Sequence, residues 1–456
     1  MTVQQMLWKS GPTDAPLPPL ADGSFLVGSM QAMLSDPTDF MVKQYQKFGP
    51  IFRIKALNNK FTVIAGPEAC LFLAREASKH FSSWDTWHSL DAEMGASQSL
   101  ISVDGEQHSR LRALEKRGYS RQTIETQFPA VLNVINGFLD QWPVGTSQVT
   151  VPQLQRLITD ELGMLIAGQG PGEYIDDVRT FVRIALMTHI TRQRPGFLRL
   201  LPQYRRARDR SLELSQNVLD AHRNGKRDPN RPPSLIDDII AATNDPTLMP
   251  EGDLVMTALG PYIAGLDTVA NTMSFLMYVL TTKPELYEQV EAEADALFAN
   301  GVPEPADLRK MDVLHRVVLE NFRMYPIAPA VPRTVKAPFE FGGYRVDVGT
   351  RMLVGTSIGH FLPHLHPEPE KFDIDRYLAP RNEHRIPGAF APFSTGSHTC
   401  LGAGLAEVQI MLTTAALLHY AKFEADPIDY KLKKVFAPTP APDNTFKLRF
   451  VKRRNH

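Results

Sequence analysis

Residues 393–402, with the sequence F-S-T-G-S-H-T-C-L-G, constrain what this chain can fold into more than any other segment. Cys400 lies between Gly396 and Gly402, and an apolar helical pattern follows at once, at residues 403–420. Glycine lets a backbone approach a flat group closely, and the free N–H groups at a helix start stabilise an anionic sulfur. The segment is therefore typical of a metal-ligating cysteine held at a turn.

His398 and Thr399 are further possible donors to a thiolate, because a cysteine must be deprotonated to bind a metal. Two other interpretations of Cys400 stay open at this point. It could be a buried structural cysteine, or a nucleophile, although no partnered base can be identified from the sequence. A c-type haem would need C-x-x-C-H, and a structural zinc site would need several clustered Cys or His residues. Neither pattern is present.

The rest of the chain reads as mainly α with a small β part. Helical patterns dominate residues 67–425 and also cover residues 36–48, whereas residues with strand-like alternation are few. The expected strands are residues 51–55, 61–65 and 446–451 and the stretch 339–354, which has a hairpin turn at 342–343. No repeat or linker divides the chain. We therefore predict one domain over residues 1–456, with a proline-rich segment at 1–35 and the catalytic domain at 36–456.

Composition narrows the class of protein. The chain has 456 residues and a formal net charge of −1, which does not favour nucleic acid as a partner. Two cysteines are too few for a disulfide framework. The N-terminus lacks a long apolar run, and the apolar segment 254–280 contains Pro261, Asp267 and Asn271, which indicates a helix buried in protein. We expect a soluble, monomeric, cytoplasmic protein without a transmembrane anchor.

Residues 393–402 resemble the haem-binding loop of the cytochromes P450. Phe393, the glycine, the basic residue and the glycine after the cysteine are in register, while Ser394 stands where that family often has glycine. The resemblance implies a helical haem-binding domain with minor β-sheets, and haem b (iron protoporphyrin IX) whose proximal iron ligand is Cys400. An anionic sulfur ligand increases the electron density at iron and favours O–O cleavage.

A second segment supports the resemblance. Glu320 and Arg323 lie three residues apart on one face of a largely apolar helix, so they can pair and are expected to be buried. Residues 372–377 resemble the family's meander, which implies that Arg376 completes a structural Glu-Arg-Arg cluster. Residues 360–363, His-Phe-Leu-Pro, depart from the family's frequent His-Arg-Asp-Pro, and we expect this to affect surface packing only.

A third segment, Ala264-Gly265-Leu266-Asp267-Thr268, is similar to the family's A-G-x-D-T, although Val269 replaces a frequent hydroxyl residue. Glycine inside a helix costs roughly 1 kcal/mol, and we interpret Gly265 as room for a flat cofactor or dioxygen. Asp267 and Thr268 can relay protons through water, and threonine can also open a helix locally. Pro261 is expected to kink the helix one turn upstream.

Cations for two haem propionates are implied at four positions. His108 and Arg112 are one helical turn apart, Arg333 follows Arg323 by ten residues, and His398 precedes the cysteine by two. Ala264, Ala328 and Val331 are expected to line the pocket near the iron, and small apolar residues there imply a lipophilic substrate.

No flavin or iron–sulfur motif is present, so electrons must come from a ferredoxin or flavodoxin-type donor with its reductase. Residues Arg110, Lys116, Arg117 and Arg121 form either a docking face for that donor or a solvated helix face. Residues 194–210 mix arginines with large apolar residues. They are expected to be a lid over the pocket, with membrane-surface contact as the alternative.

These inferences predict an NAD(P)H-driven monooxygenase that uses dioxygen to hydroxylate or epoxidise a lipophilic small molecule. The rivals are a haem-thiolate peroxygenase or isomerase, a non-catalytic haem sensor or carrier, and a haem-free cysteine hydrolase. Asp267 and Thr268 argue against the first rival, since such enzymes tend to lack the pair.

Overall fold

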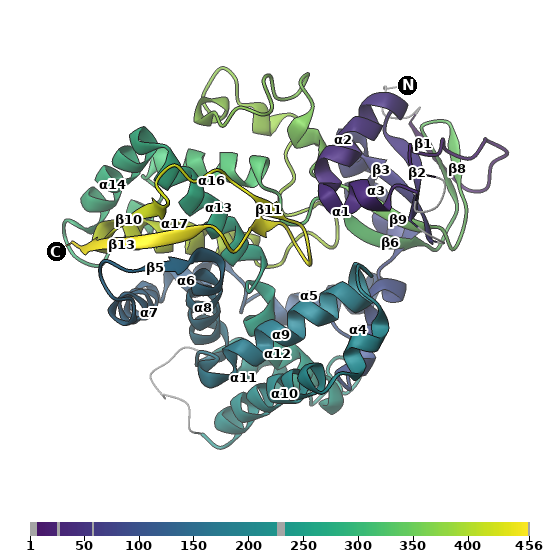
Figure 1. Ribbon diagram of the computed structural model, residues 1–456. Helices are drawn as coiled ribbons and strands as arrows, with labels where there is room; N and C mark the ends of the chain where they lie inside the picture. The colour runs from purple at the N-terminus through teal and green to yellow at the C-terminus, as the bar shows by residue number, and fades with distance from the viewer. Residues whose placement is uncertain (1–6, 25–27, 57–58, 226–232, 455–456) are drawn as a thin grey trace. The chain divides into compact units, whose positions relative to one another are not determined.

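The computed structural model describes residues 7–24, 28–56, 59–225 and 233–454 (Figure 1). The chain separates into two compact units. The first comprises Met1–Ser89, Leu100–Ser109 and Phe322–Cys400, and the second comprises Leu90–Ser99, Arg110–Asn321 and Leu401–His456. Helices predominate and the sheets are small, as the sequence predicts. That both units act as one catalytic domain stays a prediction.

A five-stranded sheet forms the centre of the first unit. Its order is β2 (Ile51–Ala56), β3 (Asn59–Ala65), β9 (Arg351–Gly355), β6 (Val331–Val335) and β4 (Phe81–Ser82). β2 and β3 are antiparallel, as their alternating residues predict, and β3 runs parallel to β9. Helix α3 (Gly66–His80) follows β3 directly and buries Phe72 against this sheet, together with Ile64 and Val354.

A smaller sheet of the first unit has the order β1 (Trp8–Ser10), β7 (Phe339–Phe341) and β8 (Tyr344–Val346). Gly342 and Gly343 connect β7 and β8 with φ angles of 58° and 81°, which confirms the predicted hairpin turn, since left-handed backbone favours glycine. The predicted helix near the N-terminus is confirmed as α2 (Pro37–Phe48), preceded by α1 (Met30–Ser35).

The second unit is mainly helical. Its helices include α6 (Arg121–Glu125), α7 (Phe128–Gln141), α8 (Thr150–Leu162), α9 (Ile175–Ala185), α10 (Pro202–Arg223), α11 (Leu235–Ala242), α12 (Leu254–Ala264), α13 (Thr268–Thr282), α14 (Pro284–Phe298), α15 (Pro305–Leu308) and α17 (Ala403–Tyr420). Three further helices cross the boundary between the units: α4 (Trp84–Glu93), α5 (Gly105–Glu115) and α16 (Asp312–Met324). The bounds of α17 are those predicted. It packs against α14, and α8 packs against α12 and α13.

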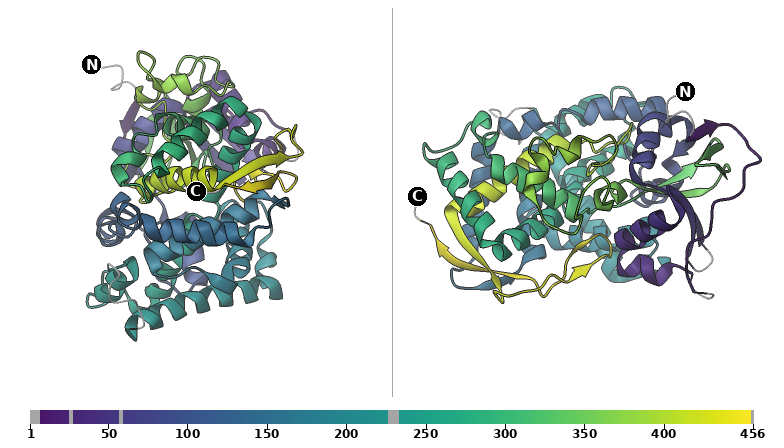
Figure 2. Two further views of the ribbon diagram at one scale, coloured as in Figure 1. Left: turned by 90° about the vertical axis from the view of Figure 1, so that its left-hand side faces the viewer. Right: turned by 90° about the horizontal axis from the view of Figure 1, so that it is seen from above.

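Two small sheets complete the second unit. β10 (Ala421–Asp426) pairs antiparallel with β13 (Lys447–Arg453), which pairs with β5 (Ser147–Val149); both C-terminal strands are yellow in Figure 2. β11 (Lys434–Val435) pairs with β12 (Ala441–Pro442). The C-terminal strand predicted at residues 446–451 is confirmed, one residue later at its start.

The apolar segment of α12 and α13 passes a length and composition test for crossing a membrane over Glu251–Thr282. However, 72% of its most apolar window is buried inside the protein. The prediction of a helix buried in protein is therefore confirmed.

The predicted kink at Pro261 stays a prediction, and the helix is interrupted further along the chain. Helix α12 continues through Pro261 to Ala264, and the helix is interrupted after that, at residues 265–267. The Thr268 hydroxyl donates to the carbonyl oxygen of Ala264 at 2.7 Å, so a side chain competes for a backbone acceptor at this point. The helix is thus interrupted within the Gly265-Leu266-Asp267-Thr268 sequence and not at Pro261.

Candidate active site

The turn that carries Cys400 is closed by its own hydrogen bonds. The Cys400 amide donates to the Phe393 carbonyl at 3.0 Å, and the Thr399 hydroxyl donates to the Gly396 carbonyl at 2.7 Å. Gly396 has φ +83°, and a Cβ there would lie 2.5 Å from the carbonyl oxygen of Leu73 in α3. Glycine is therefore required at this position by both backbone conformation and space. The turn leaves Cys400 exposed.

Ser394 explains why glycine is frequent at its position in the resembling family. Its φ is +61°, in the left-handed region that side chains other than glycine rarely adopt. Serine at this position costs on the order of 1 kcal/mol relative to a relaxed backbone. Serine in place of glycine at position 394 therefore strains the backbone of the turn.

Phe393 and Gly402 occupy the two ends of the turn. The Phe393 ring packs edge to face on Phe322, with 5.1 Å between ring centroids. Gly402 precedes the first residue of α17, and a Cβ there would meet only Tyr119, at 3.8 Å, within the second unit. Within the described part of the second unit, a side chain at position 402 would therefore meet no clash. The predicted role of Gly402 toward a cofactor stays a prediction.

Three of the predicted propionate residues gather in the first unit. His398 Nε2 lies 3.1 Å from Asp104 Oδ1, and the His108 and His398 rings lie 4.0 Å apart. Arg333 on β6 is 8% exposed and donates a hydrogen bond to the carbonyl of Pro332 at 2.7 Å. Burial lowers the pKa of Arg333 to about 10, with Asp104 opposing this effect.

This arrangement fits an anionic group. A guanidinium has five N–H donors, and a buried one needs acceptors. The sequence did not predict the carboxylate of Asp104, because no short pattern distinguishes it from other acids. Although burial works in the opposite direction, hydrogen bonds from His398 and from the Ser83 amide lower the pKa of Asp104. Arg112, half-buried one turn after His108 on α5, belongs to the other unit, and its role stays a prediction.

Asp267 and Thr268 lie in the second unit and differ in environment. Asp267 is 9% exposed and accepts a hydrogen bond from the Gln155 amide at 2.8 Å. Thr268 and Ala264 are exposed. Burial raises the pKa of Asp267, whereas the hydrogen bond from Gln155 lowers it. A titratable acid beside an exposed hydroxyl residue is the arrangement that proton transfer needs.

The interpretation of Gly265 as room for a cofactor is wrong. A Cβ on Gly265 would lie 2.2 Å from Leu162 Cδ1 and 3.2 Å from Ile158 Cγ2, both on α8. The space that a side chain of residue 265 would take is therefore filled by Leu162 and Ile158 of α8.

The Arg376 side chain is the centre of a buried network in the first unit. It donates to Glu383 Oε2 at 2.9 Å and to the carbonyls of Pro367 and Glu368 at 2.6 and 2.7 Å. Arg323 donates to the carbonyls of His360 and Lys371 at 2.8 and 3.1 Å. Both side chains are almost fully buried, which confirms the predicted burial of Arg323, while the structural role of the cluster stays a prediction.

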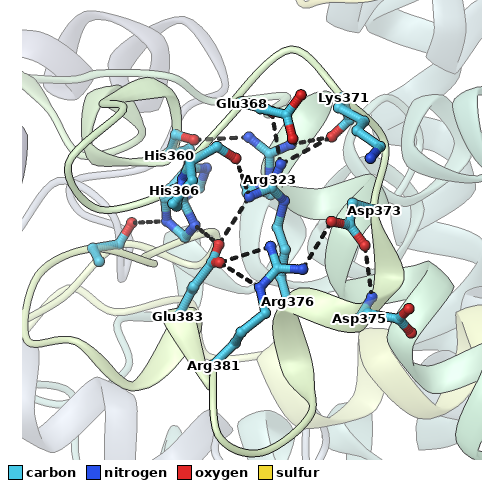
Figure 3. Close-up of polar contacts among 12 residues, drawn as sticks. Arg323, His360, His366, Glu368, Lys371, Asp373, Asp375, Arg376, Arg381 and Glu383 are labelled. Carbon is cyan, nitrogen blue, oxygen red and sulfur yellow. Dashed lines mark hydrogen bonds and ion pairs between the residues drawn. The ribbon is translucent and has the colours of Figure 1, made fainter.

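Glu383 is the second functional residue that the sequence argument missed. Figure 3 shows Arg376, Arg381 and His366 converging on its carboxylate, at 2.9, 2.7 and 3.3 Å. Although burial opposes them, the two arginines lower the pKa of Glu383. Glu383 follows Arg376 by seven residues, but nothing in the sequence distinguishes it from the neighbouring acids. Glu320 is fully buried on α16, and its predicted pairing stays a prediction.

The expectation that residues 360–363 affect only surface packing is wrong. His360 is fully buried, its Nε2 accepts a hydrogen bond from the Ala391 amide at 3.0 Å, and burial lowers its pKa to about 3. Because its carbonyl also accepts from Arg323, this segment belongs to the buried network shown in Figure 3.

The residues predicted to line the pocket and to dock an electron donor differ in exposure and pairing. Ala328 is exposed, and Val331 is half-buried at the start of β6. Among the basic residues proposed for docking, Arg110 and Arg117 pair with Asp245 and Asp238, and Arg121 pairs with Glu407. Much of that positive charge is therefore neutralised locally, which favours the solvated helix face over the docking face.

The segment 194–210 contains the exposed side chains Phe197, Leu200 and Leu201. Arg199 and the buried His189 both contact Glu93, at 3.1 and 2.5 Å. The segment is thus held to α4 within the second unit by one shared carboxylate.

Comparisons with known proteins show the family to which the chain belongs. The sequence matches the family model described as Cytochrome P450 over residues 18–444. An abscisic acid 8'-hydroxylase of Solanum lycopersicum is 26% identical over 448 residues, covering 96% of this chain and 91% of that protein. A cyclooctat-9-en-7-ol 5-monooxygenase of Streptomyces melanosporofaciens is 26% identical over 329 residues, covering 70% of this chain and 71% of that protein.

Solved structures show the same fold. A retinoic acid-bound cyanobacterial cytochrome P450 matches with a TM-score of 0.82 at 24% identity, covering 97% of this chain and 100% of that chain. The predicted fold class is confirmed.

The network around Glu383 generates a prediction about stability. Glu383→Ala leaves the buried Arg376 guanidinium without its carboxylate, so we expect a loss of about 3 kcal/mol or more in the free energy of unfolding. Arg381→Ala removes a partner whose side chain is 36% exposed, and we expect a loss below about 1 kcal/mol. Chemical denaturation of both variants measures the difference. Equal losses would contradict the assignment of Glu383 as the buried partner of Arg376.

Proposed function

The chain belongs to the cytochrome P450 family of monooxygenases, and we propose that it hydroxylates or epoxidises a lipophilic small molecule with electrons from separate redox partners. The observation that carries the proposal is the position of Cys400 at the end of a hydrogen-bonded turn, which Gly396 permits and the family match supports. Haem, bound through a thiolate, supplies the activation of dioxygen in this family.

The residues that hold the cofactor are proposed as a set. Cys400 ligates the iron of haem b, Phe393 and Gly402 bound the ligating turn, and Ala264 lies beside the ring. The buried guanidinium of Arg333, near Asp104 and His398, supports binding of a propionate, since a desolvated cation with few acceptors is stabilised by an anion. His108, His398 and Arg112 complete the proposed propionate set.

Asp267 and Thr268 are proposed to deliver protons. The exposed hydroxyl of Thr268 lies at the start of α13, and the buried carboxyl of Asp267 has a raised pKa, so it takes up a proton more readily than an exposed acid. Glu320, Arg323 and Arg376 have a structural role, to which we add Glu383.

The substrate is proposed to be an isoprenoid lipophile, contacted by Ala264, Ala328 and Val331. Abscisic acid and cyclooctat-9-en-7-ol, the compounds named for two relatives, both have isoprenoid carbon skeletons. Small apolar side chains leave room for such a bulky hydrocarbon.

The electron donor is proposed to be a ferredoxin or flavodoxin-type protein with its reductase. We further propose that the chain works as a monomer, in the cytoplasm, with both units forming one catalytic domain.

The assignment of Cys400 has a direct test. Cys400→Ser should abolish the thiolate-type absorption of the reduced, carbon monoxide-bound protein, because oxygen replaces the anionic sulfur ligand. Cys70→Ser is the matched control: its thiol is buried, donates to the Thr356 carbonyl at 3.3 Å, and has a pKa raised to about 12. The control should keep the thiolate spectrum. An unchanged spectrum in Cys400→Ser would exclude this ligand.

Thr268→Ala should uncouple electron use from product formation. With the hydroxyl removed, we expect the fraction of electrons that appear in product to fall about tenfold or more, with hydrogen peroxide released instead. Thr281→Ala is the control, because Thr281 lies on the same helix and also donates to a backbone carbonyl, that of Met277 at 2.7 Å. The measurement compares reductant consumed, product formed and peroxide released. Unchanged coupling in Thr268→Ala would remove this residue from proton delivery.

The substrate class is tested by titrating the ferric protein with a lipophile panel and recording the haem spin state. Terpenoid alcohols and acids should shift the spin state at lower concentration than straight-chain fatty acids of similar size. The opposite order would contradict an isoprenoid substrate. A spin shift with turnover by hydrogen peroxide, but by no reductase system, would favour a peroxygenase.

A further inference from the structure

The carboxyl group of Asp267 has an unusual set of partners. Its Oδ1 accepts a hydrogen bond from Gln155 Nε2 at 2.8 Å, whereas its buried Oδ2 has no hydrogen-bond partner among the described residues. Gln155 is itself 7% exposed. A buried carboxylate that is neither paired with a cation nor fully hydrogen-bonded is destabilised relative to its protonated form.

Cations on neighbouring elements face Asp267 but are not hydrogen-bonded to it in the described structure. Arg179 and Arg183 on α9 act on it through space and lower its pKa, less than burial raises it. Arg179 donates instead to Asp176 Oδ1 at 2.6 Å and to the Pro152 carbonyl at 3.1 Å. The direct partner of Asp267 is therefore a neutral amide.

Helix α8 places this amide by close packing. Gln155, Ile158 and Leu162 are spaced three and four residues apart, so they share one face of α8. Ile158 and Leu162 occupy the space beside Gly265, within the same helix interruption that contains Asp267. The packing of Leu162 and Ile158 beside Gly265 thus also holds Gln155 against the carboxyl group of Asp267. Figure 1 labels the helices concerned, α8, α12 and α13.

We propose that Gln155 is a positioning residue for proton delivery: its amide holds one carboxyl oxygen of Asp267 and leaves the other free to take up and release a proton. A cation at the same place would hold Asp267 as a permanent carboxylate. Each proton that Asp267 gives up is replaced from water, so the carboxyl group is unchanged after each cycle. This inference rests on the proposed function, in which Asp267 delivers protons.

Two substitutions of Gln155 should move the titration of Asp267 in opposite directions. Gln155→Leu removes the donor that favours the ionised form, so Asp267 should keep its proton to a higher pH. Gln155→Arg supplies a cation, so Asp267 should lose its proton at a lower pH, with each shift about one pH unit or more. The infrared band of the protonated carboxyl group, assigned by its loss in Asp267→Asn, follows this titration in the purified holoenzyme.

Coupling between electron use and product formation is measured over the same pH range. Since a protonated donor is required, coupling should fall as pH rises through the pKa of Asp267. The fall should occur at higher pH in Gln155→Leu and at lower pH in Gln155→Arg. In the Asp267→Asn background neither substitution should change coupling further. If Gln155→Arg does not fold, the comparison of Gln155→Leu with the unaltered protein is sufficient to test the proposal.

Gln153→Leu is the matched control. Gln153 lies on the same helix, is half-buried, and donates its amide to Gln148 Oε1 at 2.6 Å. Gln153→Leu should change neither the pH at which the Asp267 infrared band titrates nor the pH at which coupling falls. The inference is overturned if the Asp267 band titrates identically in Gln155→Leu and in the unaltered protein. By contrast, normal coupling in Asp267→Asn would overturn the proposed proton delivery itself, whatever Gln155 does.

Discussion

Cys400 is held at the end of a turn that only glycine at 396 permits. The carbonyl oxygen of Leu73 in α3 lies where a Cβ of residue 396 would be, and the backbone there is left-handed. Two hydrogen bonds then close the turn from Phe393 to Cys400. The position of the thiol therefore depends on contact between the turn and α3, and the proposed cofactor binding depends on that position.

Two buried ionisable side chains of this protein, Arg376 and Asp267, differ in their hydrogen-bond partners. Arg376 is surrounded by acceptors, with Glu383 and two carbonyl oxygens within 2.9 Å, so its buried guanidinium is hydrogen-bonded from several directions. Among the residues that the structure describes, Asp267 has one neutral donor, and its other carboxyl oxygen has no hydrogen-bond partner, so its protonation can change. The first arrangement suits a scaffold and the second suits proton transfer.

Predictions from the sequence were best where the chemistry is local. The bounds of α17, the hairpin at Gly342 and Gly343, and the burial of Arg323 follow from periodicity and turn residues close in the chain. Gly265 was misinterpreted because a glycine in a helix has the same appearance in sequence whether a ligand or a neighbouring helix fills the space. Leu162, the neighbour that decides the matter, is about a hundred residues away.

Taken alone, the sequence determined the fold class, the identity of the thiolate candidate and the acid–hydroxyl pair, because each is written as a short pattern of residue types. The tertiary structure decided which partners those residues have. Glu383, Asp104 and Gln155 carry no distinguishing sequence signal, since a carboxylate or an amide becomes a specific partner only when folding brings it within hydrogen-bond distance of another polar side chain.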